Sequence, residues 1–183
     1  MARETRTDKQ LRLIGEAVAL LAAASVPCWL RGGWAIDFFL GEITRPHEDV
    51  DVFAWGRDSD DLAACLAQAG FEEIGGPPPH TQRNFVKEGE VFHIALLEQT
   101  SAGKLVTPGG RWTQFGGDAA PEEWPAKMLD DSPGRLGDLV VPIVEPASLL
   151  HEKESAALIP GHTLTEKHRN DIERLRTALA KHK

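Results

Sequence analysis

The length, composition and charge of this chain exclude several classes of protein. It has 183 residues, 42% of them hydrophobic, which is enough for a proper core, and we expect a single domain over residues 1–183 with a helical C-terminal segment at about 146–183. The formal net charge of −8 argues against a general nucleic-acid binder and suits a small cationic substrate, although acidity also serves solubility alone.

The chain shows no sign of secretion or of a membrane partner. The charged N-terminus lacks the pattern of a secretory leader, and no apolar run reaches membrane-spanning length. Cys28 and Cys65 are far apart and lack metal-ligand spacing, and Cys28 lies in an apolar stretch where burial is expected. We therefore expect a cytoplasmic protein.

The first half of the chain predicts alternating helices and strands. Thr7 to Gln10 has the form of a capping box, so a helix is expected from about Asp8 to Ala24. The patterns that follow predict a strand at Cys28–Leu30, a helix at Trp34–Leu40 ended by Gly41, a strand at Val50–Trp55, a helix at Leu62–Ala69 and a strand at Phe71–Ile74.

The second half adds strands and then two helices. A hairpin is expected around Glu88-Gly89, and the Gly- and Pro-rich region 101–137 predicts short strands and loops. The hairpin strands are Gln82–Lys87 and Glu90–Glu98, and later elements are a strand at Leu139–Val144, a helix at Pro146–Leu158 and a helix from Thr163 or Thr165 to about Lys181. Because strand-to-helix crossovers are few, we predict an α+β fold in which helices pack on a small mixed β-sheet.

Two short motifs carry the chemistry. Gly32-Gly33, between a strand and a helix, lets backbone amides approach a phosphate chain closely. Asp49 and Asp51 are two residues apart on a strand, so their carboxylates share a face and can hold Mg²⁺. A Gly-Gly pair alone is usually a turn, and an Asp-x-Asp alone is usually a solvated strand end. In this order and separation, the two together are far more specific.

The segment from Gly32 to Asp51 resembles the aminoglycoside and lincosamide nucleotidyltransferases, most closely the branch that adenylylates the 2″-hydroxyl of aminoglycosides. The resemblance is strong over about residues 28–55 and weaker beyond. Its motif is Gly-Gly-Trp-Ala-Ile-Asp at 32–37, Leu-Gly at 40–41, Thr-Arg at 44–45, His47, Asp49 and Asp51. The resemblance implies a nucleotidyltransferase-like core, ATP as co-substrate and Mg²⁺ bound by the two aspartates. It implies nucleotide contacts for Gly32, Gly33, Arg45, His47 and Lys153.

The chain departs from the family pattern at one position. That pattern has a third acidic residue on a neighbouring strand as general base, and His93 occupies the corresponding place here. Neither Glu90 nor Glu98 shares the face of His93 in an alternating strand. A neutral imidazole can accept a proton but is a poor magnesium ligand. Asp49, Asp51 and His93 are therefore the candidate catalytic residues, with a merely hydrogen-bonded structural histidine as the alternative at 93.

The leading hypothesis is transfer of AMP, or another nucleoside monophosphate, from Mg-ATP to a hydroxyl of a small molecule such as an aminoglycoside or lincosamide antibiotic. The alternatives are a weakly active or inactive nucleotide-binding relative that lacks the third carboxylate, and a nucleotidyltransferase that acts on a macromolecule. The expected partner is small and cationic or sugar-containing, with no nucleic acid, and homodimerisation is left open. Trp112 and Trp124 are candidates for an aromatic pocket wall.

Overall fold

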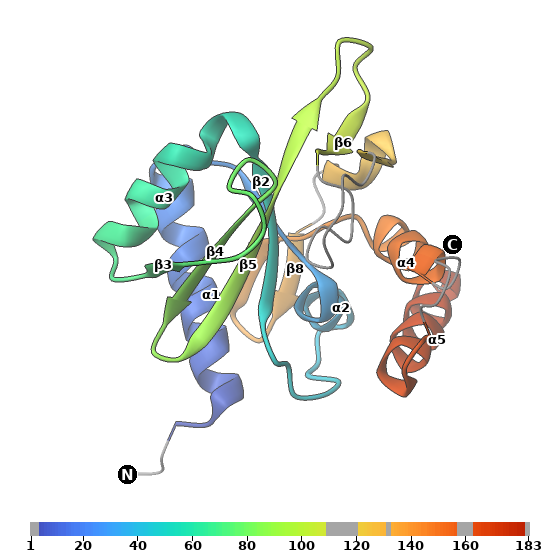
Figure 1. Ribbon diagram of the computed structural model, residues 1–183. Helices are drawn as coiled ribbons and strands as arrows, with labels where there is room; N and C mark the ends of the chain where they lie inside the picture. Colours follow the sequence, from blue (N-terminus) through green and yellow to red (C-terminus); the bar gives the residue numbers. More distant parts are fainter. Residues whose placement is uncertain (1–3, 109–120, 131–132, 157–162, 182–183) are drawn as a thin grey trace.

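The computed structural model describes residues 4–108, 121–130, 133–156 and 163–181. Its centre is a mixed sheet with the strand order β1-β2-β5-β4-β3 (Figure 1). The strands are β1 (Cys28–Arg31), β2 (Val50–Trp55), β5 (Glu90–Gln99), β4 (Gln82–Lys87) and β3 (Glu72–Ile74). Strands β2 and β5 are parallel, and the other neighbouring pairs are antiparallel. The protein therefore has the predicted α+β fold with a small mixed sheet.

Smaller elements extend this sheet at its far end. Strand β5 continues to pair with β6 (Leu105–Thr107), which pairs in turn with β7 (Glu122–Trp124). A separate hairpin joins β8 (Pro133–Leu136) to β9 (Leu139–Pro142), and η1 (Gly56–Asp58) and η3 (Ala126–Leu129) are short 3₁₀ helices. The strand predicted at Leu139–Val144 stops early at Pro142; Val144 instead donates its amide hydrogen to the Leu30 carbonyl (2.9 Å).

The helices form two groups around the sheet (Figure 1). Helices α1 (Arg6–Ala23) and α3 (Ser59–Gln68) pack together on one face, whereas α2 (Gly32–Leu40), α4 (Pro146–Ser155) and α5 (Glu166–Lys181) gather toward the β1 edge. Among the helices that the structure describes, none is both long and apolar enough to cross a membrane. The predicted helix Pro146–Leu158 is observed as far as Ser155, and its last two predicted residues lie outside the described part of the chain.

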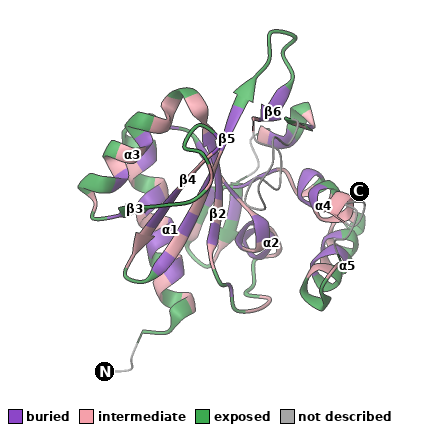
Figure 2. Cartoon of the chain, in the orientation of Figure 1, coloured by how far each residue is buried: buried purple, intermediate pink, exposed green. Residues whose placement is uncertain are grey.

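A large part of the core lies between the sheet and α1, and buried residues are drawn in purple in Figure 2. Leu13, Ile14, Ala17 and Leu21 recur at helical spacing and are all buried. They face the strand residues that alternate inward, namely Cys28, Leu30, Val50, Val52, Phe92 and Ile94. Each such aliphatic side chain contributes about 1.5–3 kcal/mol on full burial. The residues that alternate with them along each strand, such as Arg31, Asp51 and His93, point to the opposite face of the sheet.

The capping box of α1 begins two residues earlier than predicted. The cap is Thr5, whose hydroxyl accepts the amide hydrogen of Asp8 (3.1 Å), while the Asp8 carboxylate accepts from the Thr5 amide and hydroxyl. Gln10, the expected partner of Thr7, is instead buried and donates to the carboxylate of Glu90 (2.8 Å). The carboxylate of Asp8 outcompetes the Gln10 amide because it accepts two hydrogen bonds at the frayed end.

The hairpin turn at Glu88-Gly89 fixes the register of β4 against β5. Both residues have positive φ angles, 52° and 81°, as a two-residue hairpin turn of the I′ type requires. Lys87 therefore faces Glu90, and three pairs further along Asn84 faces His93. This turn decides which residue of β4 lies beside the candidate base.

Candidate active site

A row of four polar residues crosses the sheet on the face opposite α1. Arg31 pairs with Asp51 between β1 and β2, Asp51 pairs with His93 between β2 and β5, and His93 pairs with Asn84 between β5 and β4. We call Arg31, Asp51, His93 and Asn84 the polar row. Directly paired residues on one face have Cβ atoms about 4.5–5.5 Å apart, so each side chain lies within reach of the next.

Asp49 extends the polar row just before β2 begins. Its Oδ2 lies 3.8 Å from Nε2 of His93, and the side chains of Asp49 and His93 are 45% and 33% exposed. Two carboxylates and one imidazole are thus brought together at a surface that a soluble ligand can reach. The predicted catalytic trio lies in one place.

Gly32 is required by the close approach of Asp51. A Cβ at position 32 would lie 2.5 Å from Oδ2 of Asp51, and Gly32 has a φ angle of +65° that favours glycine. The strand-to-helix turn and the second aspartate are therefore packed directly against each other. This contact explains why the glycine and the Asp-x-Asp motif occur together in the sequence.

Gly33 is required by a different pair of side chains. A Cβ there would lie 2.6 Å from Nη2 of Arg45 and 2.6 Å from the ring of His47. His47 is buried, its Nε2 lies 2.7 Å from Oδ2 of Asp37, and its ring packs 4.5 Å from that of Trp34. The ring of His47, one of the predicted nucleotide-binding residues, is thus packed inside the protein. Its Nδ1 lies 3.0 Å from Nη1 of Arg45.

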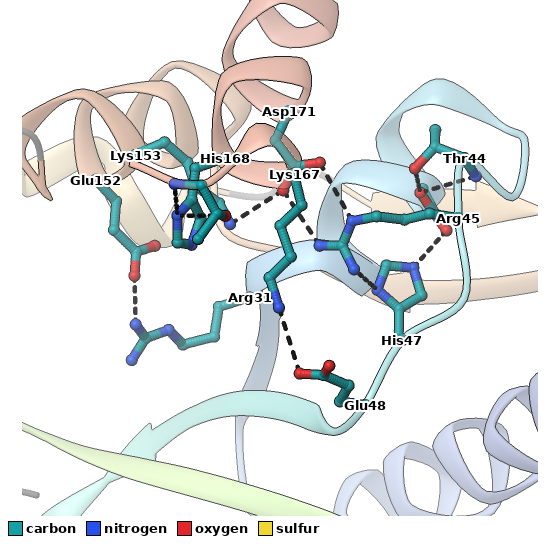
Figure 3. Close-up of polar contacts among 12 residues, drawn as sticks. Arg31, Thr44, Arg45, His47, Glu48, Glu152, Lys153, Lys167, His168 and Asp171 are labelled. Carbon is teal, nitrogen blue, oxygen red and sulfur yellow. Dashed lines mark hydrogen bonds and ion pairs between the residues drawn. The ribbon is translucent and has the colours of Figure 1, made fainter. Parts of the chain in front are cut away.

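Arg45 and Lys153 converge on one buried carboxylate, as Figure 3 shows. Nη2 of Arg45 and Nζ of Lys153 each lie 3.2 Å from Oδ2 of Asp171 on α5, whose residue is 1% exposed. A further cation, Lys167, lies 3.4 Å from Glu48. We call Arg45, Lys153 and Asp171 the α5 cluster. With two cations around one anion, this cluster carries a net positive charge.

The pKa of Asp171 reflects these partners. Burial would raise the pKa, but the hydrogen bond from Arg45 and the positive charges of Lys153 and Arg45 outweigh burial, and the pKa lies below its ordinary value. Asp171 is thus ionised at neutral pH. It holds α5 and α4 against the loop that carries Arg45.

The pKa of Asp51 is shifted in the opposite direction. Burial raises it above its ordinary value, and the negative charges of Asp49 and Glu152 add to this effect. The positive charge of Arg31 opposes the shift without cancelling it. Burial, together with the nearby carboxylates, therefore disfavours the ionised form of Asp51, and a bound cation would offset that cost.

Arg31 is the internal counter-charge of this site. It forms an ion pair with Glu152 of α4 and lies over the ring of Phe53 (4.3 Å to the centroid). Burial would lower its pKa, but the charges of Glu152 and Asp51 more than offset that, so the pKa is raised and the guanidinium stays charged. Arg31 therefore links β2 to helix α4.

The residues at β2 fit a magnesium ion that is shared with a substrate. Within the described ranges, no three or more His, Cys, Asp or Glu side chains are grouped so as to hold a metal by themselves. Asp49 and Asp51 supply two hard oxygen donors, which matches the way Mg²⁺ is held by one or two carboxylates, waters and phosphate oxygens.

The cavities beside helix α5 lie apart from Asp49, Asp51 and His93. Two cavities of about 640 and 860 Å³ flank α5, and the residues that line them do not include Asp49, Asp51 or His93. Trp124 is buried against Phe53 (5.2 Å between rings) and donates its indole hydrogen to Thr107 (3.1 Å), so it packs in the core. Trp112, the other candidate pocket wall, lies outside the described residues.

Four residues of this arrangement were not singled out from the sequence. Arg31 and Glu152 pair across 121 positions, and Asp171 meets Arg45 across 126 positions, distances at which sequence spacing carries no signal. Asn84 did leave a signal. A two-residue turn at Glu88-Gly89 pairs residues whose numbers sum to 177, which places Asn84 opposite His93.

Comparison with solved structures shows the class of fold. The chain resembles the lincosamide antibiotic adenylyltransferase LnuA, solved with lincomycin bound, with 19% identity, a TM-score of 0.68 and coverage of 97% of this chain and 99% of that chain. It also resembles ANT(2″)-Ia, solved in complex with adenylyl-2″-tobramycin, with 20% identity, a TM-score of 0.72 and coverage of 95% and 91%. At these identities the likeness shows a nucleotidyltransferase fold.

Comparison of sequences shows the family. Residues 13–175 match the family described as aminoglycoside-2″-adenylyltransferase, and the chain belongs to that family. It is 38% identical over 61 residues to a 2″-aminoglycoside nucleotidyltransferase of Klebsiella pneumoniae and to one of Escherichia coli. These alignments span about a third of this chain and of each curated relative, 33% and 34%.

Proposed function

We propose that this protein transfers AMP from Mg-ATP to a hydroxyl group of an aminoglycoside or lincosamide-type small molecule. The observation that carries the proposal is the juxtaposition of Asp49, Asp51 and His93 beside the Gly32 turn, with His93 3.8 Å from Asp49. The negative net charge of −8 supports a cationic acceptor such as an aminoglycoside.

Each part of the site has a role in this reaction. Asp49 and Asp51 would hold Mg²⁺, which when bound offsets charge on the phosphates. Gly32 and Gly33 would admit the triphosphate to the start of α2, and Arg45 and Lys153 of the positively charged α5 cluster would neutralise the departing pyrophosphate. The buried His47 would act through Arg45, whose guanidinium it contacts.

The proton of the acceptor hydroxyl would move to the imidazole of His93. As it moves, the hydroxyl oxygen forms a bond to the α-phosphorus, and the bond from that phosphorus to pyrophosphate breaks. A histidine suits this task because its ordinary pKa of about 6.5 lies close to neutral pH. The imidazole takes the place of a third carboxylate as base, while the two aspartates remain as metal ligands.

Pyrophosphate release from Mg-ATP in the presence of a panel of aminoglycosides and lincosamides tests the proposal. We expect release with at least one acceptor, and its loss in Asp49→Ala and Asp51→Ala. Absence of release with every acceptor would overturn it. Mg²⁺-dependent ATP binding by calorimetry without any product would then favour the nucleotide-binding relative, and AMP attached to RNA or protein would favour the macromolecular acceptor.

Two further features belong to the proposal. Residues 1–183 act as one domain, which the ion pairs Arg31–Glu152 and Arg45–Asp171 between the sheet side and the C-terminal helices support. A homodimer would complete an acceptor site on a short chain, and sedimentation with and without ATP measures whether one forms.

A further inference from the structure

The side chain of His93 has a buried polar partner that the proposed reaction leaves without a role. Nδ1 of His93 lies 2.9 Å from Oδ1 of Asn84. Asn84 is 5% exposed, whereas the His93 side chain is 33% exposed. The imidazole therefore has one nitrogen turned to the interior and the other, Nε2, turned toward Asp49 and the solvent.

The contacts of Asn84 determine which of its amide atoms faces the histidine. Nε2 of Gln82 donates to Oδ1 of Asn84 (2.7 Å), and Nδ2 of Asn84 donates to the carbonyl of Gly75 (3.4 Å). Turning the amide over would place its oxygen against the Gly75 carbonyl, which can only accept, whereas the Gln82 amide could turn with it. The oxygen of Asn84 must therefore point to His93.

The neighbouring loop keeps Asn84 in this position. A Cβ at Gly76 would lie 1.9 Å from Nδ2 of Asn84, so the loop packs against the amide so tightly that only glycine fits there. Gln82, Asn84 and the turn at Gly75-Gly76 thus form a rigid support behind the imidazole. A buried amide with all of its contacts satisfied is costly to rotate.

An amide oxygen can only accept a hydrogen bond. The nitrogen that faces it, Nδ1 of His93, must therefore carry a hydrogen, and in the neutral ring the lone pair then lies on Nε2. We propose that Asn84 is a positioning residue that fixes His93 in the Nδ1–H tautomer, so that the Nε2 lone pair faces an acceptor hydroxyl beside Asp49 and Asp51. The part that concerns the hydroxyl rests on the proposed function; the tautomer stands without it.

The tautomer is measured directly by ¹⁵N NMR of the ring nitrogens in the ligand-free protein. The chain has seven histidines, and a spectrum of His93→Gln identifies the signals of residue 93. Spectra are recorded at increasing pH until the signals of residue 93 no longer change, and the tautomer is read there, in the neutral ring. We expect a protonated Nδ1 and an unprotonated Nε2. A protonated Nε2 would overturn the inference, even in an active enzyme.

Two substitutions at one position separate positioning from simple packing. Asn84→Asp keeps an acceptor toward Nδ1, so it retains the tautomer and most of kcat, although its second oxygen faces the Gly75 carbonyl and lowers the melting temperature. Asn84→Leu fills the space without an acceptor, so the tautomers mix and kcat falls by about 10- to 100-fold, within what one general base contributes. KM for ATP stays within about threefold in both variants because Asn84 does not contact Gly32, Gly33 or Arg45.

The outcomes distinguish this inference from the proposed function. If the protein shows the Nδ1–H tautomer but releases no pyrophosphate, the inference about the tautomer holds and the proposed function is wrong. Turnover that is equal in Asn84→Leu and Asn84→Asp, with both variants folded by circular dichroism, would overturn the positioning role. If Asn84→Leu does not fold, the tautomer of the unaltered protein still decides.

Discussion

Two aspartates shielded from water, Asp51 on β2 and Asp171 on α5, differ in the direction in which the protein shifts their pKa. Asp51 is half-buried, and its one cationic neighbour on the sheet, Arg31, is shared with Glu152; its pKa is raised. Asp171 is buried between Arg45 and Lys153, and its pKa is lowered. The charge of Asp171 is satisfied within the chain, whereas that of Asp51 calls for an external cation.

The ionised carboxylate of Asp171 therefore stabilises the folded protein, whereas that of Asp51 destabilises it. An ionised carboxylate whose folded pKa is lowered contributes stability, and one whose folded pKa is raised lowers it. Sites that bind a ligand's charge are places where such uncompensated charge is expected. Substitution of the two aspartates by the same residue should therefore give opposite effects on stability.

The largest expected effect follows from Asp51→Asn. If Asp51 holds the metal as proposed, its loss should lower kcat by at least about 10²–10³-fold, the range seen when one charge-stabilising group is removed. The melting temperature of the ligand-free protein should rise, because the substitution removes an unfavourable charge. Steady-state pyrophosphate release and a thermal melt measure the two. Asp138→Asn, at an exposed position in the turn between β8 and β9, is the matched control and should change neither. A lower melting temperature in Asp51→Asn would contradict the comparison.

The second effect follows from Asp171→Asn. This change leaves Arg45 and Lys153 without their buried carboxylate and should lower the free energy of unfolding by about 3–5 kcal/mol, the cost of breaking a buried pair. Urea denaturation measures it, and KM for ATP should rise more than kcat falls because the cations lose their common anchor. Glu173→Gln, exposed on the same helix, should stay within about 0.5 kcal/mol of the parent. Equal stabilities of Asp171→Asn and Glu173→Gln would show that the α5 cluster is not structural.

A smaller effect is expected from magnesium itself. An ion that binds only the folded protein stabilises it by RT ln(1 + [Mg²⁺]/Kd), about 1 kcal/mol at five times Kd. Titration of the melting temperature with MgCl₂ should show this rise in the parent protein and not in Asp51→Asn. EDTA should reverse it and stop pyrophosphate release. An equal rise in both proteins would place the ion elsewhere.

The smallest effects appear in the pH dependence of the two variants. The stability that Asp171 contributes is present above the ordinary aspartate pKa of about 3.9 and is lost only as pH falls further, through the lower folded pKa. The penalty from Asp51 is full above its raised pKa and fades as pH falls toward about 4. Urea titrations at pH 7 and at about pH 4 should therefore show Asp51→Asn converging with the parent at the lower pH. Asp171→Asn should keep most of its deficit there.

The fold and the catalytic strand were predictable because their signals are local. Helical spacing in α1, alternation in β2 and β5, and the turn at Glu88-Gly89 depend only on residues near one another in sequence. The position of His93 beside Asp51 followed from the resemblance and from the strand pattern. The cap at Thr5 was missed because two overlapping polar runs, 5–8 and 7–10, both fit the motif and only the observed side-chain contacts choose between them.

The neighbours of the site could not be predicted in the same way. Asp171 approaches Arg45 only because α5 folds back across the loop after α2, and Arg31 meets Glu152 only because α4 lies beyond β1. No spacing rule links residues more than a hundred positions apart. His47 was assigned to the nucleotide, yet its ring faces Asp37 and Trp34, a burial that depends on the fold of the loop.

The hairpin turn at Glu88-Gly89 has a consequence for how this site can change in evolution or design. Side chains alternate between the faces of a strand, so one residue added to the turn would shift β5 by one position against β4. Phe92 would then take the place of His93 opposite Asn84, and the imidazole would lose this support. The identity of the base can be exchanged by point mutation, but the length of this turn has to be inherited unchanged.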